Sequence, residues 1–275
     1  MQQHLIAIDL DGTTLNNQSK LSELTIRTLR QLNELGHLVS IVTGRPYRNS
    51  EQIYRELNIA APIVNFNGAL CHFPNHSSYI PSYHIALDRE IAFDLFAHQK
   101  ELEIDLLMAE GRNQLFTSSM NLPDSPYDPF NLDQIARLSR ESLTYNPTAL
   151  TVFSSDNRLD HIAKNITDRY GDEVSVRTWG GQLPCLEIVR KGINKAVGVQ
   201  AIAEFHRIPQ DAILAFGDED NDVEMIQYAG HGVAMKNAID EVKAVAKDQT
   251  SYTNDEEGLA KYLLEYFDIK QSDLY

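Results

Sequence analysis

Short apolar runs alternate with amphipathic stretches near the N-terminus of the chain. The apolar runs predict strands at Leu5–Ile8, Leu38–Val42 and Ile63–Phe66. Between them, apolar positions recur every three or four residues, which predicts helices at Ser22–Leu35 and Tyr47–Leu57. Strands that alternate with helices in this way are typical of a parallel sheet.

The same alternation returns in the last third of the chain. The two segments together therefore predict one α/β domain built on a Rossmann-like, doubly wound parallel sheet. The helices predicted here are Asn194–Phe205, Asn221–Tyr228, Ala238–Ala246 and Glu256–Phe267, and the strands are Ala212–Phe216 and Gly232–Met235.

The middle of the chain has a different pattern, in which strands and helices are mixed without regular alternation. We interpret residues 83–188 as an α+β domain inserted into the core domain, which then consists of residues 1–82 and 189–275. The strands predicted in the insertion are Asp105–Ala109, Leu115–Thr117, Leu150–Ser154, Val174–Thr178 and Cys185–Val189, and the helices are Arg89–Lys100, Leu132–Ser142 and Arg158–Tyr170.

The composition favours a soluble enzyme and disfavours several other classes of protein. With 275 residues, 43% of them apolar, the chain can bury a sizeable core. A net charge of −15 argues against nucleic acid as a partner. The only cysteines, Cys71 and Cys185, lie far apart, which predicts free thiols and no zinc site. No apolar stretch is long enough for a membrane helix or a signal peptide, so we expect a cytoplasmic protein without a membrane partner.

Two carboxylates stand where the first predicted strand ends. Asp9 and Asp11, in the run Asp9-Leu10-Asp11-Gly12-Thr13, are two positions apart, so on an extended chain both side chains point the same way. Turn formation alone explains Asp and Gly after a strand. However, two repelling carboxylates at a strand end are costly unless a cation or a reaction recruits them, so we favour a functional pair.

Further polar groups follow other strands of the predicted sheet, at the edge where such sheets bind ligands. Thr43-Gly44-Arg45 offers a hydroxyl, an open backbone and a guanidinium, which suits an anion. Asp218 and Asp222 are four apart at a helix start, and their hard oxygen ligands suit magnesium. Lys195 opens the helix after the insertion, where its ammonium group can meet a phosphate.

Each of these features alone also has an ordinary structural explanation. A lone helical lysine is usually solvated, and acidic residues at a helix start, such as Glu219 and Asp220, often only complement the helix dipole. Arg45 either contacts a substrate or pairs with an acid, and we favour a place in the active site. Taken together, the features can converge on one phosphoryl group.

With these motifs in place, the sequence resembles the haloacid dehalogenase (HAD) superfamily of aspartate-based phosphatases, and specifically its Cof-type members with a C2 (type IIB) α+β cap. The resemblance covers nearly the whole chain; its one departure is Ala196, where many relatives have glycine. It rests on Asp9–Leu15, Thr43–Arg45, Lys195 and Gly217–Asp222, and further on Asn67–Ala69, Asn237–Ala238 and Asn254–Gly258.

This resemblance implies a magnesium-dependent phosphatase that hydrolyses small phosphate monoesters of a sugar, nucleotide or cofactor. It implies that Asp9 is the nucleophile that forms an aspartyl phosphate and that Asp11 is the general acid and base. It also implies a cap that selects the substrate. The expected partner is a small phosphorylated metabolite, and we expect a monomer or a homodimer. The implied ligands of Mg²⁺ are Asp9, the backbone carbonyl of Asp11, Asp218 and Asp222; the phosphate-binding residues are Thr43, Gly44, Lys195 and Asn221; and Arg45 and Asn67 lie on the substrate side.

Three other functions remain open from the residues alone. A phosphomutase uses the same carboxylates but returns the phosphoryl group to a sugar instead of water. A signalling receiver also combines an acceptor aspartate with acids, Thr and Lys, but there the acid pair precedes the acceptor. An inactive binding protein is the third possibility, which the complete set of motifs disfavours.

Overall fold

The computed structural model describes residues 2–74, 82–111, 114–122, 135–154, 158–179 and 184–274. The chain forms two compact units, Met1–Tyr83 with Asn194–Tyr275, and His84–Ile193. The second boundary thus follows Ile193 instead of residue 188. The reason is that strand β11 (Cys185–Arg190) pairs within the inserted unit, and the N–H of Lys191 still donates to the carbonyl of Glu173 there.

The first unit contains a parallel sheet of five strands in the order β14-β13-β12-β1-β2. The sequence of strand β1, between β12 and β2, is Leu-Ile-Ala-Ile, and all four side chains are fully buried, as expected for a strand covered on both faces. The predicted fold class is confirmed. The strands are β1 (Leu5–Ile8), β2 (Leu38–Ile41), β12 (Ile213–Gly217), β13 (His231–Ala234) and β14 (Asp248–Gln249).

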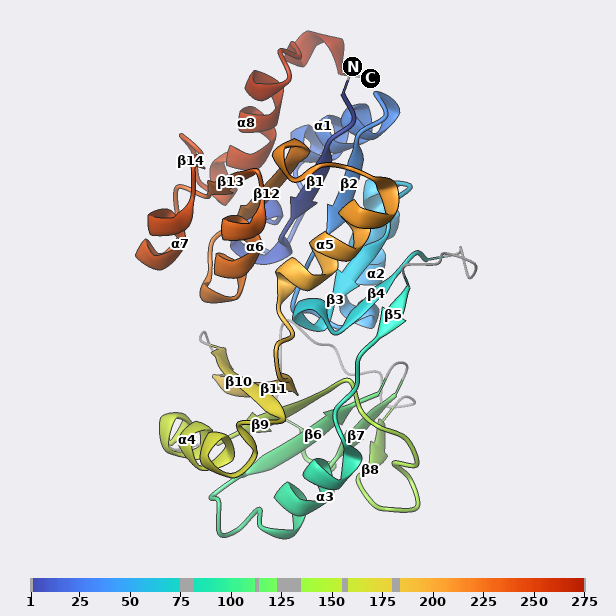
Figure 1. The fold of residues 1–275 in the computed structure, drawn as a ribbon, viewed down its shortest axis with the longest axis vertical. Helices are drawn as coiled ribbons and strands as arrows, with labels where there is room; N and C mark the ends of the chain where they lie inside the picture. The colour runs from blue at the N-terminus through green and yellow to red at the C-terminus, as the bar shows by residue number, and fades with distance from the viewer. Residues whose placement is uncertain are drawn as a thin grey trace. The chain divides into compact units, whose positions relative to one another are not determined.

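Helices cover both faces of this sheet. Helix α1 contacts α8, helix α5 contacts α6, and the two pairs lie on opposite faces (Figure 1). Side-chain caps fix two of the starts, because Ser22 accepts from the N–H of Thr25 and Asn194 accepts from that of Val197. The helices are α1 (Glu23–Glu34), α2 (Tyr47–Leu57), α5 (Lys195–His206), α6 (Val223–Tyr228), α7 (Asp240–Val245) and α8 (Gly258–Tyr266).

The third predicted strand of the core belongs to a small sheet of its own. Strand β3 (Ile63–Asn65) pairs antiparallel with β4 (Leu70–His72) in the sheet β3-β4-β5, where β5 is Tyr83–His84. It meets the main sheet through a single parallel bridge between Val42 and Val64. The antiparallel partner was not anticipated, because β4 is only three residues long and carries no alternating pattern.

The inserted unit contains a six-stranded sheet in the order β10-β11-β9-β6-β7-β8, antiparallel except for the pair β7-β8. Over its described residues, two helices pack on the apolar side chains of this sheet, and these residues form a second hydrophobic core. The elements are α3 (Arg89–Ala97), β6 (Leu106–Glu110), β7 (Leu115–Thr117), β8 (Ile135–Arg137), β9 (Ala149–Phe153), α4 (Leu159–Tyr170), β10 (Val174–Trp179) and β11.

The helix predicted at Leu132–Ser142 is wrong over its described part, which contains β8 and then a turn. Strand β8 pairs along Leu115–Thr117, so long-range strand pairing overrides the local helical periodicity. Residues 132–134 lie outside the described residues. Among the helices that the structure describes, none is long and apolar enough to cross a membrane.

Candidate active site

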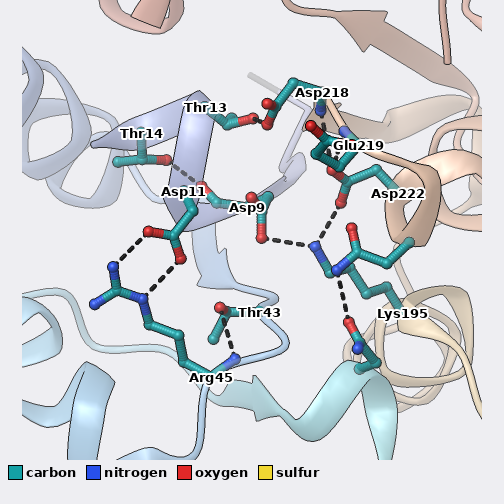
Figure 2. A network of polar contacts seen from close by, with 12 residues as sticks. Asp9, Asp11, Thr13, Thr14, Thr43, Arg45, Lys195, Asp218, Glu219 and Asp222 are labelled. Carbon is teal, nitrogen blue, oxygen red and sulfur yellow. Dashed lines mark hydrogen bonds and ion pairs between the residues drawn. The ribbon is translucent and has the colours of Figure 1, made fainter. Parts of the chain in front are cut away.

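Functional side chains follow three neighbouring strands at one edge of the parallel sheet. Asp9 directly follows β1, Asp218 directly follows β12, and Thr43 lies two residues beyond β2. The chain order reverses around β1, since β2 and β12 flank it on opposite sides, and parallel sheets bind ligands at such a point. Figure 2 shows these side chains gathered with Lys195, from the start of α5.

Lys195 connects two of the carboxylates from a fully buried position. Its Nζ donates to Oδ1 of Asp9 and to Oδ1 of Asp222, each at 2.6 Å, and its side chain is 0% exposed (Figure 2). A buried ammonium group needs such partners, because desolvation without them costs several kcal/mol. The contact holds the carboxylate of Asp9 in one orientation.

The turn after β12 wraps around the carboxylate of Asp222. Oδ2 of Asp222 accepts from the backbone N–H groups of Asp218, at 2.9 Å, and Glu219, at 3.2 Å. Gly217 allows this approach, since a Cβ there would lie 2.4 Å from the Cβ of Asp222. Both oxygens of Asp222 are therefore engaged within the protein, and Glu219 and Asp222 also cap the helical turn reciprocally.

Residues 9–15, which we call the aspartate loop, fold tightly against Asp218. Thr13 Oγ1 donates to Oδ1 of Asp218 at 2.7 Å, and Thr14 Oγ1 donates to the backbone carbonyl of Asp9. Gly12 has a φ of +71°, and a Cβ at this position would lie 2.0 Å from Oδ2 of Asp218. Only glycine therefore fits there. The loop and Asp218 hold one another in place.

Burial and mutual repulsion perturb the carboxylates of the site. Burial raises the pKa of Asp9 to about 7, against the attraction of Lys195 and with the repulsion of Asp222 and Asp11. Burial and the charges of Asp9 and Asp222 raise the pKa of Asp218 to about 8. Burial lowers the pKa of Lys195, but the two carboxylates outweigh it and raise the pKa above its usual value. The cluster thus carries more negative charge than one lysine neutralises.

Asp11 lies in a different environment from Asp9, although the two are only two residues apart. Its carboxylate points toward Arg45, whose Nε donates to Oδ2 at 2.7 Å and whose Nη2 donates to Oδ1 (Figure 2). The Asp11 side chain is 48% exposed and that of Arg45 only 11%. Of the two roles considered for Arg45, the structure thus places it in an ion pair, and the acid is Asp11.

The remaining sequence-predicted residues lie in the turns after β2, β3 and β12, beginning with Thr43. Its side chain is buried, and its Oγ1 accepts from the N–H of Arg45 at 3.1 Å. Its carbonyl accepts from the N–H of Asn67, and Gly44 next to it is buried. Asn221 Nδ2 donates to Oδ1 of Asn67 at 3.1 Å, which links the turn after β12 to the turn after β3.

Three carboxylates provide the donors of a possible metal site. One oxygen each of Asp9, Asp218 and Asp222 lies within 4.8 Å of the others, and all three residues are buried. Oxygen donors without histidine or cysteine fit a hard divalent cation. The raised pKa values of Asp9 and Asp218 fit it too, because a cation would offset the repulsion that causes them. The site can therefore hold a divalent metal ion.

Sequence reasoning did not assign roles to four residues that lie in the aspartate loop or contact it. Thr13 and Thr14 stood in the motif without a stated contact. Asn237 Nδ2 donates to the carbonyl of Gly12, and Asn254 Nδ2 donates to that of Leu15. The last two lie more than 200 positions from the loop in the sequence. Their presence in the C-terminal motifs was the only signal.

Comparisons with known proteins agree with this geometry. Residues 6–263 match the family of haloacid dehalogenase-like hydrolases. The chain is 37% identical over 270 residues to the 5-amino-6-(5-phospho-D-ribitylamino)uracil phosphatase YitU of Bacillus subtilis (strain 168), covering 97% of this chain and 98% of that one. It is 28% identical over 290 residues to the phosphatase YwpJ of the same organism, with 94% and 99% covered.

The fold has a close counterpart among solved structures. A haloacid dehalogenase-like hydrolase from Bacteroides thetaiotaomicron superposes with a TM-score of 0.81 at 24% identity, over 97% of this chain and all of the other. This likeness concerns the fold. The match to the family over most of the chain, and a relative 37% identical over nearly its full length, establish that this chain belongs to the haloacid dehalogenase-like hydrolases and is a phosphatase.

Proposed function

We propose that this enzyme is a magnesium-dependent phosphatase of small phosphate monoesters that works through an aspartyl phosphate on Asp9. The observation that carries the proposal is the carboxylate of Asp9 at the end of β1. It is 8% exposed, fixed by Lys195 at 2.6 Å and grouped with Asp218 and Asp222. A fixed, partly desolvated carboxylate in a cluster that attracts cations is suited to attack a phosphoryl group.

In the first half-reaction, an oxygen of Asp9 attacks phosphorus, and the bond between phosphorus and the leaving oxygen breaks. Asp11 gives its proton to that oxygen, so the product leaves as an alcohol. In the second half-reaction, Asp11 takes a proton from water, and the resulting hydroxyl attacks phosphorus. The bond between phosphorus and Asp9 then breaks, which releases inorganic phosphate and restores both carboxyl groups.

The phosphoryl oxygens need positive or hydrogen-bonding partners beside so many carboxylates. We assign this role to Lys195, the hydroxyl of Thr43, the N–H of Gly44 and the amide of Asn221. Arg45 carries a second positive charge beside the carboxylate of Asp11, and Asn67 supports Asn221 by the contact at 3.1 Å. Both are placed on the substrate side in this proposal.

We assign the metal ion to Asp9, the backbone carbonyl of Asp11, and Asp218. Asp222 would hold the ion directly or through water, and its three hydrogen bonds to Lys195, Asp218 and Glu219 favour water as the intermediary. Magnesium is the expected ion because all these donors are oxygens. When bound, it supplies positive charge that offsets the repulsion between the carboxylates and the phosphoryl group.

The substrate is proposed from the 37% identical relative, which is named a 5-amino-6-(5-phospho-D-ribitylamino)uracil phosphatase. We infer that 5-amino-6-(5-phospho-D-ribitylamino)uracil, a phosphate ester of a primary alcohol on a ribityl chain, is the first substrate to test. The residues assigned above bind only the phosphoryl group that all candidate substrates share. We therefore assign the choice of leaving group to the inserted unit, residues 84–193.

The proposal is tested with a panel of phosphate esters that includes this compound, sugar phosphates, nucleotides and cofactor phosphates. Free phosphate is measured with magnesium and again after chelation by EDTA. We expect release that depends on magnesium and is lost in Asp9→Asn, because an amide is a poor nucleophile at phosphorus. Asp9→Asn with normal turnover would contradict the proposal. An isomerised sugar phosphate without free phosphate would instead identify a phosphomutase.

A further inference from the structure

Two asparagines far along the chain hold the aspartate loop by its backbone. Asn237, shortly after β13, donates from Nδ2 to the carbonyl of Gly12 at 2.8 Å. Asn254, in the turn before α8, donates from Nδ2 to the carbonyl of Leu15 at 3.0 Å. These contacts span 225 and 239 positions of sequence. They approach the loop from the C-terminal part of the first unit.

The two asparagines also contact one another, so they act on the loop as one support. The backbone N–H of Asn254 donates to Oδ1 of Asn237 at 3.0 Å, and the residue Asn254 is only 8% exposed. Asn17, just after the loop, accepts from Nδ2 of Asn254 and makes two hydrogen bonds to Asp255. Unlike the other two asparagines, Asn17 donates to no carbonyl of the loop in these contacts.

The loop is sensitive to where these carbonyls point. Gly12 has a positive φ, and its Cα faces the carboxylate of Asp218 so closely that a Cβ would overlap it. A rotation of the peptide after Gly12 would therefore change the contact with Asp218 and the placement of the peptide before it, which carries the carbonyl of Asp11. Orienting residues behind a metal or reacting group commonly change affinity or rate when they are altered.

We propose that Asn237 and Asn254 are positioning residues for phosphoryl transfer. By fixing the carbonyls of Gly12 and Leu15, they keep Asp9 and the carbonyl of Asp11 correctly placed relative to Asp218. This inference rests on the proposed function, because it gives Asp9 and Asp11 the roles assigned there. It adds a task for the C-terminal motifs that contain these asparagines, which the proposed mechanism does not otherwise use.

The test compares Asn237→Asp with Asn17→Ala. Asn237→Asp keeps the oxygen that accepts from Asn254 but replaces the donor to Gly12 by an oxygen, which repels that carbonyl. We expect kcat to fall by about ten- to a hundred-fold, with KM changed much less. We also expect the dissociation constant of Mg²⁺, measured by calorimetry without substrate, to rise by about ten-fold or more. Asn17→Ala should leave kcat and the Mg²⁺ affinity close to the wild-type values.

If the two asparagines only stabilise the fold, the result will be different. Asn237→Asp would then lower the melting temperature but retain wild-type kcat and Mg²⁺ affinity at temperatures where it is folded, and that outcome would overturn the inference. If Asn237→Asp does not fold, Asn237→Ala removes the donor without adding charge and is judged by the same two readouts. Asp9→Asn is measured alongside. If Asp9→Asn keeps normal activity, the proposed function is wrong. If Asp9→Asn loses activity but the Asn237 variant does not, only the positioning role is rejected.

Discussion

Asp9 and Asp11 lie two positions apart in the sequence, yet they occupy opposite environments. The side chain of Asp9 is 8% exposed and paired with the fully buried Lys195, whereas that of Asp11 is 48% exposed and paired with Arg45, whose own side chain is 11% exposed. The difference fits two tasks. A nucleophile gains from a fixed, desolvated position, whereas a group that carries protons to and from solvent-derived water must be able to change partners.

The comparison predicts that the two carboxylates respond differently to the leaving group. Asp11→Asn should slow hydrolysis of alkyl phosphates by about 10²–10⁴-fold, because the leaving alkoxide receives no proton. The first step with p-nitrophenyl phosphate should be nearly unaffected, since nitrophenolate leaves without a proton. Burst kinetics with this substrate measure that step. An equal loss for both substrates would contradict the role of Asp11 as the acid.

The buried pair predicts a large effect on stability. Lys195→Met leaves Asp9 and Asp222 buried without their cation, which should lower the free energy of unfolding by about 3–5 kcal/mol. The matched control is Lys164→Met, because Lys164 pairs with Asp168 on the surface, where both side chains are more than half exposed. That change should cost about 0.5 kcal/mol or less. Urea denaturation measures both, and equal losses would show that burial of the pair does not matter.

The sequence alone predicted the placement of several site residues well. Asp9, Thr43 and Asp218 follow apolar runs that form neighbouring parallel strands, and topology then brings their positions to one edge. The pairing of Arg45 with Asp11 was left open, because side-chain direction in a loop depends on tertiary contacts. The support from Asn237 and Asn254 was not predicted, since no local pattern encodes a hydrogen bond across more than 200 positions.

The helix expected at Leu132–Ser142 shows the same limit in the fold. Its apolar spacing is compatible with a helix, but Ile135–Arg137 pair with β7 instead, and this partner cannot be read from local periodicity. Strand β14 consists of only two residues, both exposed, and the sequence does not predict it for the same reason. Long, regularly patterned elements such as α2, whose predicted and observed ends coincide at Tyr47–Leu57, depend less on distant partners.

The partly exposed pair of Arg45 and Asp11 predicts a smaller effect than the buried contacts of Lys195. Arg45→Gln should reduce kcat for alkyl phosphates by about five- to ten-fold, since a partly exposed ion pair is worth about 1 kcal/mol. The reduction should be weaker for p-nitrophenyl phosphate, if Arg45 acts by holding Asp11. Arg27→Gln, which breaks an exposed pair within α1, is the control. Equal losses on both substrates would point to direct phosphate contact by Arg45 instead.

A further prediction concerns the pH dependence of stability in the metal-free enzyme. The folded-state pKa values of Asp9 and Asp218, about 7 and about 8, lie above the unfolded value of 3.8. The unfolded chain therefore releases these protons first, so stability should fall as pH rises from about 4 to about 8. Thermal unfolding in EDTA should show this fall, less steeply in Asp218→Asn, and magnesium should reduce it. Identical pH profiles for the wild type and Asp218→Asn would contradict the burial of this charge.

The central claim is that Asp9 becomes transiently phosphorylated. A crystal structure of the enzyme with magnesium and beryllium fluoride, which mimics an acyl phosphate, tests it most directly. The account predicts that the beryllium fluoride group is bonded to a carboxylate oxygen of Asp9. A group bonded to any other side chain, or none under conditions in which the enzyme is inhibited, would contradict it.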